Sequence, residues 1–290
     1  MFTETKRFSL PVGIVALAFS VLGLCGCASS RGGGDTAVRT HENLNATLYL
    51  KSAEYGVICR STYERATEQL LRNLHVAPPS VVANYNVTNV AERSPAILLD
   101  IDETVLDNSH YEAEKVLKNR HRWERLSWEN WVRRRRGDAV PGAIEFINAA
   151  ISNQVRVVFI TNRSGSVRED TIASLQKAGM QKEPDMLLMP GDVSMKTDKA
   201  DRRRFAAEHY DLLVNVGDDL TDFLEIDKNS SPEERVDAAR RFSDRWDKCW
   251  FLLPNPCYGS WEASLLRKLE PNASDHAIVE AKRAWVREIR

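Results

Sequence analysis

The sequence carries almost no net charge, because 40 Lys and Arg residues are balanced by 41 Asp and Glu residues. Binding to a nucleic-acid polymer requires a net basic face, so this balance argues against that class of partner and leaves small anionic ligands open. Glycine and proline are also scarce, with 14 and 11 residues in 290, and they form no repetitive tract. Collagen-like chains, linker arrays and low-complexity disordered chains are therefore excluded.

The histidine and cysteine spacings of zinc sites are missing as well. The six His residues lie far apart, and the five Cys residues follow no zinc-ligand pattern. Apart from Cys25 and Cys27 there are Cys59, Cys249 and Cys257, an odd number that leaves one thiol unpaired. Cys249 and Cys257 either form a disulfide across the turn between them or are, like Cys59, small buried apolar side chains.

A long apolar run extends from Phe8 to Leu24, directly after a basic pair. It is shorter than the roughly 20 residues of a membrane-spanning helix and is typical of an export signal. Its end, Leu24-Cys25-Gly26-Cys27, resembles a bacterial lipobox, which implies removal of residues 1–26 and lipidation of Cys27. An ordinary cleaved signal is the alternative. By the same resemblance, Ala28 implies a bacterial outer-membrane lipoprotein that faces the periplasm or the cell surface.

After a flexible tether, expected over 27–43, an N-terminal helical segment is expected over 44–90, where apolar residues recur at steps of three and four. The pattern then changes to short apolar runs that alternate with helices, which indicates a parallel α/β sheet. A helix is expected again in the C-terminal stretch 267–290. The predicted strands are Ala96–Leu99, Val155–Ile160, Met186–Met189, Leu212–Val216 and Trp250–Leu253.

Polar side chains gather where these strands end, which is the edge at which an open α/β sheet places its site. The first strand runs into Asp100-Ile101-Asp102. Two carboxylates so close together repel each other when buried, so a cation is expected between them. Oxygen ligands without His or Cys favour magnesium over zinc.

Later strands add further polar groups to the same edge. Thr161 and Asn162 follow the second strand, and an acidic cluster of Asp218, Asp219 and Asp222 follows the fourth. Between these clusters, one of the lysines at 196 and 199 is expected to neutralise an incoming phosphate, and the rest of that basic stretch to cover a helix surface.

In this order, the acidic pair, the threonine, the lysine and the second acidic cluster resemble the four motifs of the haloacid dehalogenase-like phosphohydrolases. More narrowly, the chain from 44 to 266 resembles the class C acid phosphatases, the lipoprotein members of subfamily IIIB, some of which act as 5′-nucleotidases. The segments that carry this narrower resemblance include 97–108, Trp128-x-x-Trp131, 217–223 and 253–261. It implies a Rossmann-like parallel sheet with flanking helices over 91–266 and a small insert cap at about 109–140.

The resemblance also implies roles for individual residues. Asp100 is the nucleophile that forms an aspartyl-phosphate, and Asp102 is the general acid and base. Mg²⁺ is held by Asp100, the main-chain carbonyl of Asp102 and Asp218, with support from Asp222. The phosphoryl oxygens are bound by Thr161, Asn162 and Lys199, of which Lys199 fits the family's Lys-x-x-Arg-Arg form better than Lys196 does. Asp219 is interpreted as a bystander.

The short insert implies an open site for varied phosphomonoesters, including nucleoside monophosphates. Trp128 and Tyr258 match aromatic positions near the family's leaving-group pocket, whereas Trp131 is interpreted as core packing. Arg133-Arg134-Arg135-Arg136 is either an anion-attracting surface or, as we favour, a solvated helix face. The alternative to an enzyme is a non-catalytic binding lipoprotein on the same fold, as some plant relatives are thought to be, although loss of the nucleophile marks such proteins and Asp100 is present here.

Overall fold

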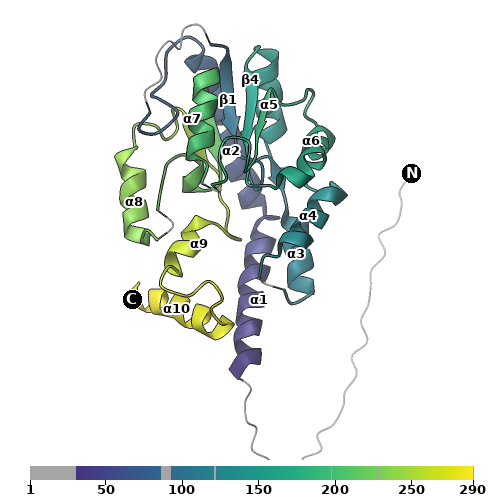
Figure 1. Ribbon diagram of the computed structural model, residues 1–290, viewed down its shortest axis with the longest axis vertical. Coiled ribbons are helices and arrows are strands. Elements are labelled where there is room, and N and C mark those ends of the chain that lie inside the picture. The colour runs from purple at the N-terminus through teal and green to yellow at the C-terminus, as the bar shows by residue number, and fades with distance from the viewer. Residues whose placement is uncertain (1–30, 86–92, 121, 197, 228, 290) are drawn as a thin grey trace, which may run out of the picture. The chain divides into compact units, whose positions relative to one another are not determined.

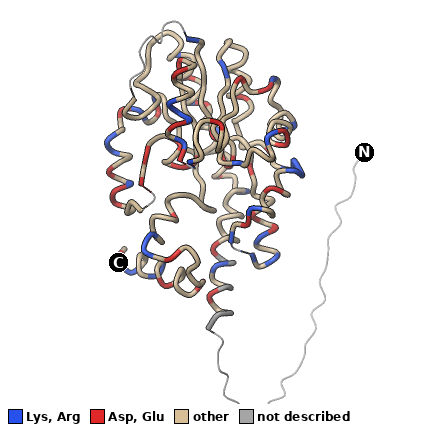
Figure 2. Tube along the Cα trace, in the orientation of Figure 1, with Lys and Arg blue, Asp and Glu red and all other residues tan. Residues whose placement is uncertain are grey.

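A computed structural model describes residues 31–85, 93–120, 122–196, 198–227 and 229–289 (Figure 1). The expected signal peptide and Cys27 lie outside these residues. Basic and acidic residues are interspersed along the described helices (Figure 2). None of the described helices is long and apolar enough to cross a membrane. The helices are α1 (Arg31–Tyr49), α2 (Ala53–Asn73), α3 (Ser109–Leu117), α4 (Arg125–Arg134), α5 (Ala143–Ser152), α6 (Arg168–Lys177), α7 (Ala200–His209), α8 (Pro232–Arg241), α9 (Ser260–Leu265) and α10 (Asp275–Glu288).

The main sheet has five parallel strands in the order β5-β4-β1-β6-β7. Leu99, at the end of β1, pairs with Phe159 of β4 on one side and Val216 of β6 on the other. The ends of these three central strands therefore lie side by side. The five predicted strands are confirmed, as β1 (Pro95–Leu99), β4 (Arg156–Ile160), β5 (Met186–Leu188), β6 (Asp211–Gly217) and β7 (Trp250–Leu252).

Both faces of the sheet are buried, as expected for apolar strands with helices on either side. Successive residues of β1 point to opposite faces. Ile97 and Leu99 belong to a core that includes buried residues of α2 and α5, whereas Ala96 and Leu98 belong to a second core that includes residues of α7 and α8. The predicted parallel α/β fold with flanking helices is therefore confirmed, and the two helical layers hold the strand ends in fixed positions.

The insert expected at about 109–140 contains α3 and α4. Two short strands, β2 (Leu106–Asp107) and β3 (Asp138–Ala139), pair in antiparallel fashion at its two ends. Trp131 of α4 is buried, and its indole N–H donates to Asn108 Oδ1 at 2.9 Å, so this residue is part of the packing beneath the insert. Arg133, Arg134 and Arg135 are exposed, as expected for a solvated helix face, and they form ion pairs with the buried Glu129 and the partly exposed Glu114 and Asp170.

The N-terminal region differs from the expected flexible tether, because α1 already begins at Arg31. Glycines at 32–34 suggest a mobile chain, but tertiary contacts outweigh this local preference. The helix packs against α3 and α10 (Figure 1). A hydrogen bond joins Asp35 to His276 at 3.0 Å, and an ion pair joins Glu42 to Lys282 at 2.7 Å. Residues 31–43 are therefore part of the folded unit.

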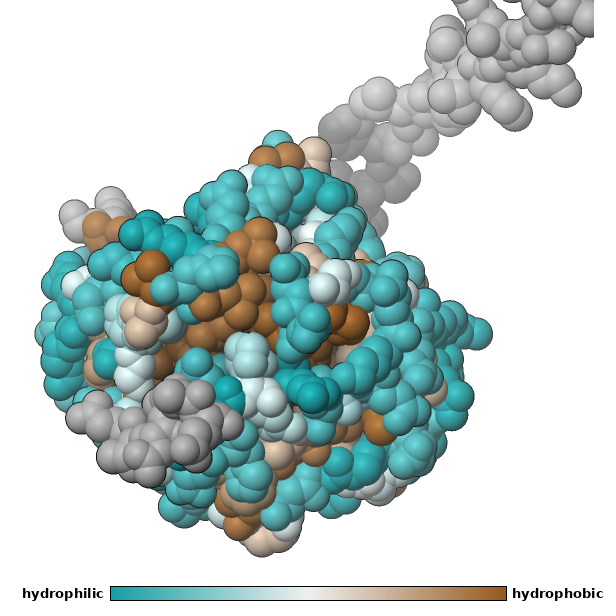
Figure 3. All heavy atoms as spheres, turned by 90° about the horizontal axis from the view of Figure 1, so that it is seen from above, coloured by the Kyte–Doolittle hydropathy of each residue, from teal (hydrophilic) through white to brown (hydrophobic). Residues whose placement is uncertain are grey.

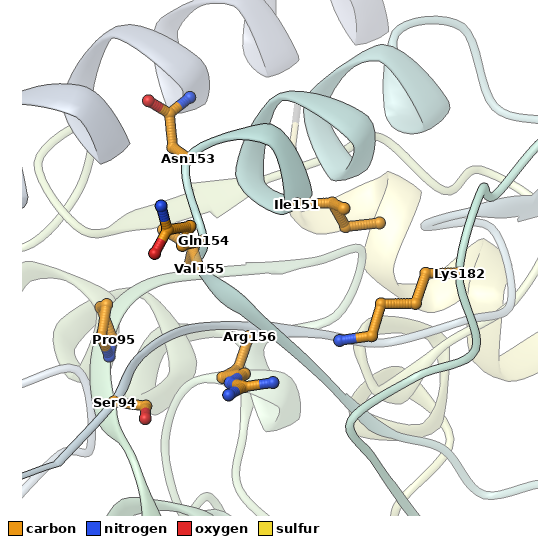
Figure 4. Close-up of a pocket in the computed structure, with 8 residues that line it drawn as sticks. All are labelled: Ser94, Pro95, Ile151, Asn153, Gln154, Val155, Arg156 and Lys182. Carbon is orange, nitrogen blue, oxygen red and sulfur yellow. The ribbon is translucent and has the colours of Figure 1, made fainter.

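The edge where the strands begin holds two cavities, of about 650 and 530 Å³. It forms the upper end of the molecule in Figure 1, and Figure 3 looks down on it and shows apolar side chains gathered in a hollow. The first cavity has two cations, Arg156 and Lys182 (Figure 4), and both pair with Asp185, at 3.0 and 2.8 Å. No carboxylate is among the described residues that line this first cavity.

Candidate active site

Three carboxylates converge where β1 and β6 end. Asp100 directly follows β1, Asp218 directly follows β6, and Asp222 ends a short 3₁₀ turn, η3 (Leu220–Asp222). One oxygen from each carboxylate lies within 4.8 Å of one from each of the others. Lys199, just before α7, donates from Nζ to Asp100 Oδ1 at 2.5 Å and to Asp222 Oδ1 at 2.6 Å. The sheet thus brings together four residues that the sequence spreads over more than a hundred positions.

These carboxylates are crowded and poorly solvated. The pKa of Asp100 is raised to about 7, mainly by burial and also by the charges of Asp222 and Asp102, which together outweigh the lowering effect of Lys199. Burial, followed by the charges of Asp222 and Asp100, also raises the pKa of Asp218 well above its usual value. One lysine therefore does not compensate for the negative charge. Converging hard oxygen ligands with excess negative charge fit a magnesium ion.

Lys199 is charged at this position. Burial alone would lower its pKa, but the charges of Asp100 and Asp222 outweigh burial and raise the pKa above its usual value. Lys196, the alternative, is exposed and pairs with Asp201 at 3.3 Å. The structure therefore places Lys199, and not Lys196, beside the carboxylates.

Asp102 lies next to the cluster, but its carboxylate points to a different partner. Arg163 Nη2 donates to Asp102 Oδ1 at 2.7 Å, and Nε donates to Oδ1 and Oδ2 at 3.0 and 3.2 Å. Asn108 Nδ2 donates to the same Oδ1 at 2.9 Å. Arg163 and Asn108 are both buried, so the carboxylate of Asp102 is held in one orientation. Arg163 is not among the site residues predicted from the sequence, although it directly follows Thr161 and Asn162.

Arg202, three residues after Lys199, fixes the loop after β4. Arg202 donates from Nη1 to the carbonyl of Thr161 at 2.6 Å and from Nη2 to Asn162 Oδ1 at 2.7 Å. Thr161 is buried, and its hydroxyl accepts the N–H of Arg163 at 3.1 Å. Arg203 donates in the same way to the carbonyl of Thr221, at 2.6 Å. The Lys-x-x-Arg-Arg stretch thus directs its lysine to the carboxylates and its arginines to the two loops beside them.

Asp219 has a structural role instead of belonging to the carboxylate cluster. Its side chain accepts hydrogen bonds from the backbone of Thr221 at 2.9 Å and of Ser260 at 2.6 Å, and from the hydroxyl groups of both residues. Burial would raise its pKa, but the bonds from Ser260 and Thr221 outweigh burial and lower it. Asp219 therefore connects the loop after β6 to the start of α9.

A cavity of about 790 Å³ opens in front of these residues. Trp128 and Tyr258, the two predicted pocket residues, both line it and are half-buried. The ring of Trp128 lies edge-on to Tyr111 at 5.1 Å between centroids, with the guanidinium of Arg163 at 5.8 Å. The cavity therefore has charged groups at its base and aromatic surfaces on its wall. Its polar base is lined by Asp100, Asp102, Asn162, Arg163, Lys199, Asp218 and Asp222.

The described cysteines contribute no cross-link to this region. Cys59 and Cys249 are buried, Cys257 is half-buried at the cavity wall, and all three thiols are free. The possible bridge between Cys249 and Cys257 is thus not formed. Burial raises the pKa of the Cys59 thiol to about 11 and that of Cys249 to about 12, so neither is a reactive thiolate near neutral pH.

Known proteins share this fold. Two solved structures of the class C acid phosphatase from Bacillus anthracis are similar, each with a TM-score of 0.73. One is 27% identical over 85% of this chain and 97% of that chain. The other, with tungstate bound, is 26% identical over 84% and 96% of the two chains.

Among curated proteins, the stem 31 kDa glycoprotein of Glycine max is 26% identical over 182 residues, which cover 58% of this chain and 56% of that protein. The chain thus spans about half the length of the curated relatives it matches. A family model described as HAD superfamily, subfamily IIIB (acid phosphatase) matches residues 26–261. Because this match covers the sheet, the insert and every residue of the carboxylate cluster, the chain belongs to the subfamily IIIB acid phosphatases of the HAD superfamily.

Proposed function

We propose that this protein is a magnesium-dependent acid phosphatase that hydrolyses phosphomonoesters through an aspartyl-phosphate. The observation that carries this proposal is the position of Lys199, which contacts Asp100 and Asp222 while Asp218 completes the cluster. A nucleophilic carboxylate needs a neighbouring cation that also neutralises the incoming phosphate, and Lys199 meets that need. The tungstate of the related Bacillus anthracis structure shows that a relative binds a tetrahedral oxyanion.

In the first step, a carboxylate oxygen of Asp100 attacks phosphorus, and the bond from phosphorus to the ester oxygen breaks. Asp102 donates its proton to the departing alkoxide, which leaves as an alcohol. In the second step, Asp102 takes a proton from water, whose oxygen attacks the phosphorus of the aspartyl-phosphate. Inorganic phosphate leaves, and Asp100 and the proton on Asp102 are restored, so one acid–base group serves both halves.

Other residues hold the groups that react. Lys199 and the Asn162 side chain border the cavity beside Asp100, where they can donate to phosphoryl oxygens. The hydroxyl of Thr161 accepts one hydrogen bond from the loop and still has its own hydrogen to donate. Mg²⁺ held by Asp100, Asp218, Asp222 and the main-chain carbonyl of Asp102 would orient the phosphate and neutralise its charge.

The leaving group would lie against the aromatic wall. Trp128 and Tyr258 offer flat apolar surfaces on which a nucleobase can stack, so nucleoside monophosphates are proposed among the substrates. The cavity of about 790 Å³ is large enough for such a ligand, because small-molecule sites are commonly about 300–1,000 Å³.

The chain is also proposed to be an outer-membrane lipoprotein anchored through Cys27. The support is the sequence Leu24-Cys25-Gly26-Cys27 after an apolar run. Because α1 begins at Arg31, very few residues would separate the lipid from the folded unit. Labelling with radioactive palmitate should mark the wild-type chain and the Cys25→Ala variant but not Cys27→Ala; labelling of Cys27→Ala would refute the anchor.

Hydrolysis of p-nitrophenyl phosphate by the purified full chain tests the proposed activity. Turnover should require added Mg²⁺ and stop when a chelator is present. Activity that persists after complete removal of divalent ions would refute the magnesium requirement. A folded, Mg²⁺-loaded protein that releases no phosphate from any tested monoester would favour the non-catalytic binding lipoprotein.

A further inference from the structure

The segment that follows β7 continues the edge of the sheet that carries the carboxylates, yet only Tyr258 of this segment has a part in the proposed function. The backbone N–H of Leu253 donates to the carbonyl of Gly217 at 2.8 Å, so the segment begins beside the residue that precedes Asp218. Asn255 follows two residues later and is half-buried. Its side chain is therefore within reach of the carboxylate cluster.

The carboxylate of Asp218 is held at both oxygens. Asn255 donates from Nδ2 to Asp218 Oδ2 at 2.8 Å, and the hydroxyl of Thr104 donates to Oδ1 at 3.0 Å. These bonds fix the direction of the carboxylate, and lone pairs remain on both oxygens for a cation. Both donors are neutral, whereas the other two carboxylates of the cluster contact the charged Lys199. Asp218 is thus held in place while it keeps the negative charge that attracts a metal ion.

The amide of Asn255 can take only one orientation. Its Oδ1 accepts the backbone N–H of Cys257 at 3.0 Å and, at the longer distance of 3.4 Å, that of Tyr258. An amide nitrogen cannot accept such bonds, so Nδ2 must face Asp218 as a donor. The indole of Trp261 supports the same turn, because it donates to the main-chain carbonyls of Asn255 and Tyr258 at 3.1 Å each. The turn therefore directs one hydrogen-bond donor at the carboxylate.

Asn255 contacts Asp218 from outside the active-site cavity. Asp218 lines that cavity, and Asn255 is not among the described residues that do so. Any effect of Asn255 on a bound ion is then exerted through Asp218. Such an effect is expected because the clustered carboxylates repel one another, so an unsupported Asp218 would turn away and would have to be reoriented when an ion binds.

We propose that Asn255 is a positioning residue that holds Asp218 in the orientation in which it binds Mg²⁺. This inference rests on the proposed function, in which Asp218 is a metal ligand. Hydrogen-bond partners of metal ligands typically contribute about 10- to 100-fold to metal affinity. The contribution of Asn255 should therefore be measurable in the binding of Mg²⁺ itself, before any substrate is present.

Calorimetric titration of the metal-free full chain with Mg²⁺ tests this inference. Asn255→Ala should raise the dissociation constant of Mg²⁺ about tenfold or more. Asn255→Ser should have the same effect although it supports the turn, because a serine hydroxyl can accept the N–H two residues further on but is too short to reach Asp218.

Two control variants separate the bond to Asp218 from the turn that carries it. Trp261→Phe removes the indole bonds of the turn and leaves the bond from Asn255 to Asp218 intact. Asn153→Ala removes an exposed asparagine whose amide donates to the carbonyl of Ala149 and which lines the first cavity, at the opposite edge of the sheet. In both variants the dissociation constant of Mg²⁺ should stay within about twofold of the wild-type value.

An unchanged dissociation constant in folded Asn255→Ala would overturn the inference, and Asn255→Ser decides the question if Asn255→Ala does not fold. An equal increase in Trp261→Phe would overturn it as well, because Asn255 would then act only as part of the turn. A wild-type chain that binds no Mg²⁺ would refute both the metal requirement and this inference.

Release of phosphate from p-nitrophenyl phosphate by the wild type, measured in parallel, separates the two proposals. Turnover together with Mg²⁺ binding that does not depend on Asn255 refutes the role of Asn255 alone. Mg²⁺ binding that depends on Asn255, in a chain without turnover, refutes the catalytic proposal alone.

Discussion

Arg163 holds the carboxylate of Asp102 with two nitrogens: Nη2 lies 2.7 Å from Oδ1, and Nε lies 3.0 and 3.2 Å from the two oxygens. The arginine follows β4 and the aspartate follows β1, and these strands are neighbours in the sheet. The orientation of the proposed acid–base group is therefore set by the register of two strands. Arg163 is in this respect a positioning residue for Asp102.

Replacing Arg163 should lower kcat more than it raises KM, because the phosphate-binding residues stay in place while Asp102 loses its fixed orientation. Misplacement of a reacting group by about 1 Å can cost roughly 10²-fold in rate, so we expect a loss of about that size in Arg163→Ala. Steady-state kinetics with p-nitrophenyl phosphate measure it. Arg163→Lys should keep part of the rate, and a kcat of wild-type size in Arg163→Ala would contradict the positioning role.

The two lysines near α7 form a matched pair. Lys199→Met removes the cation that contacts Asp100 and Asp222, and we expect kcat/KM to fall by at least about 10²-fold. Lys196→Met removes an exposed charge paired with Asp201 and should stay within about twofold of wild type. Equal losses of activity in the two variants would contradict the assignment of Lys199, and not Lys196, to the active site.

Mg²⁺ should stabilise the folded protein, because it relieves the repulsion among Asp100, Asp218 and Asp222. At about a hundred times the dissociation constant, a ligand adds roughly 2.7 kcal/mol, so Tm should rise by several degrees. Thermal unfolding with Mg²⁺ and with chelator measures this shift. Asp218→Asn should reduce it, and Asp201→Asn, a half-buried carboxylate outside the cluster, should not; an unchanged shift in Asp218→Asn would place the metal elsewhere.

The size of that shift should depend on pH. Burial raises the pKa of Asp100 to about 7, above its ordinary value, so the folded state without metal binds a proton that the unfolded state does not. Such a group destabilises the fold as pH rises from its unfolded pKa through its folded pKa, and the destabilisation is complete above about pH 7. The Mg²⁺-induced rise in Tm should therefore be larger near pH 8 than near pH 5. A larger rise at the lower pH would mean that these carboxylates are not the ligands.

Tyr258 offers a test of the nucleotide proposal that leaves the catalytic carboxylates intact. Tyr258→Ala should raise KM for a nucleoside monophosphate about tenfold or more, since stacking of a base on an aromatic ring contributes roughly 1–3 kcal/mol. The KM for a small aryl phosphate should change far less. Equal effects on the two substrates would show that Tyr258 does not contact the leaving group.

Much of the fold and of the carboxylate cluster could be predicted, because the signals are local. Short apolar runs mark the five strands, and Asp100, Asp218 and Asp222 lie within a few residues of strand ends. Parallel strands bring their carboxyl ends to one edge of the sheet. Assigning these residues to strand ends is therefore enough to predict that they lie near each other.

What escaped prediction depends on contacts between distant residues. The pair of Arg163 and Asp102 spans 61 positions, and the bond of Asp219 to Ser260 spans 41. The local sequence around these residues does not differ from that of an ordinary surface loop. The helix at 31–43 was missed because its glycines suggest a flexible chain, whereas its packing against α10 depends on residues more than two hundred positions away.

The proposed mechanism depends above all on Asp100 acting as the nucleophile. The most direct test is phosphate release from p-nitrophenyl phosphate by the full chain and its Asp100→Asn variant, both saturated with Mg²⁺ and shown to be folded. The mechanism predicts turnover by the wild type and a loss of at least about 10³-fold in Asp100→Asn, because an amide cannot form the aspartyl-phosphate. Turnover by Asp100→Asn at a rate close to wild type would contradict it.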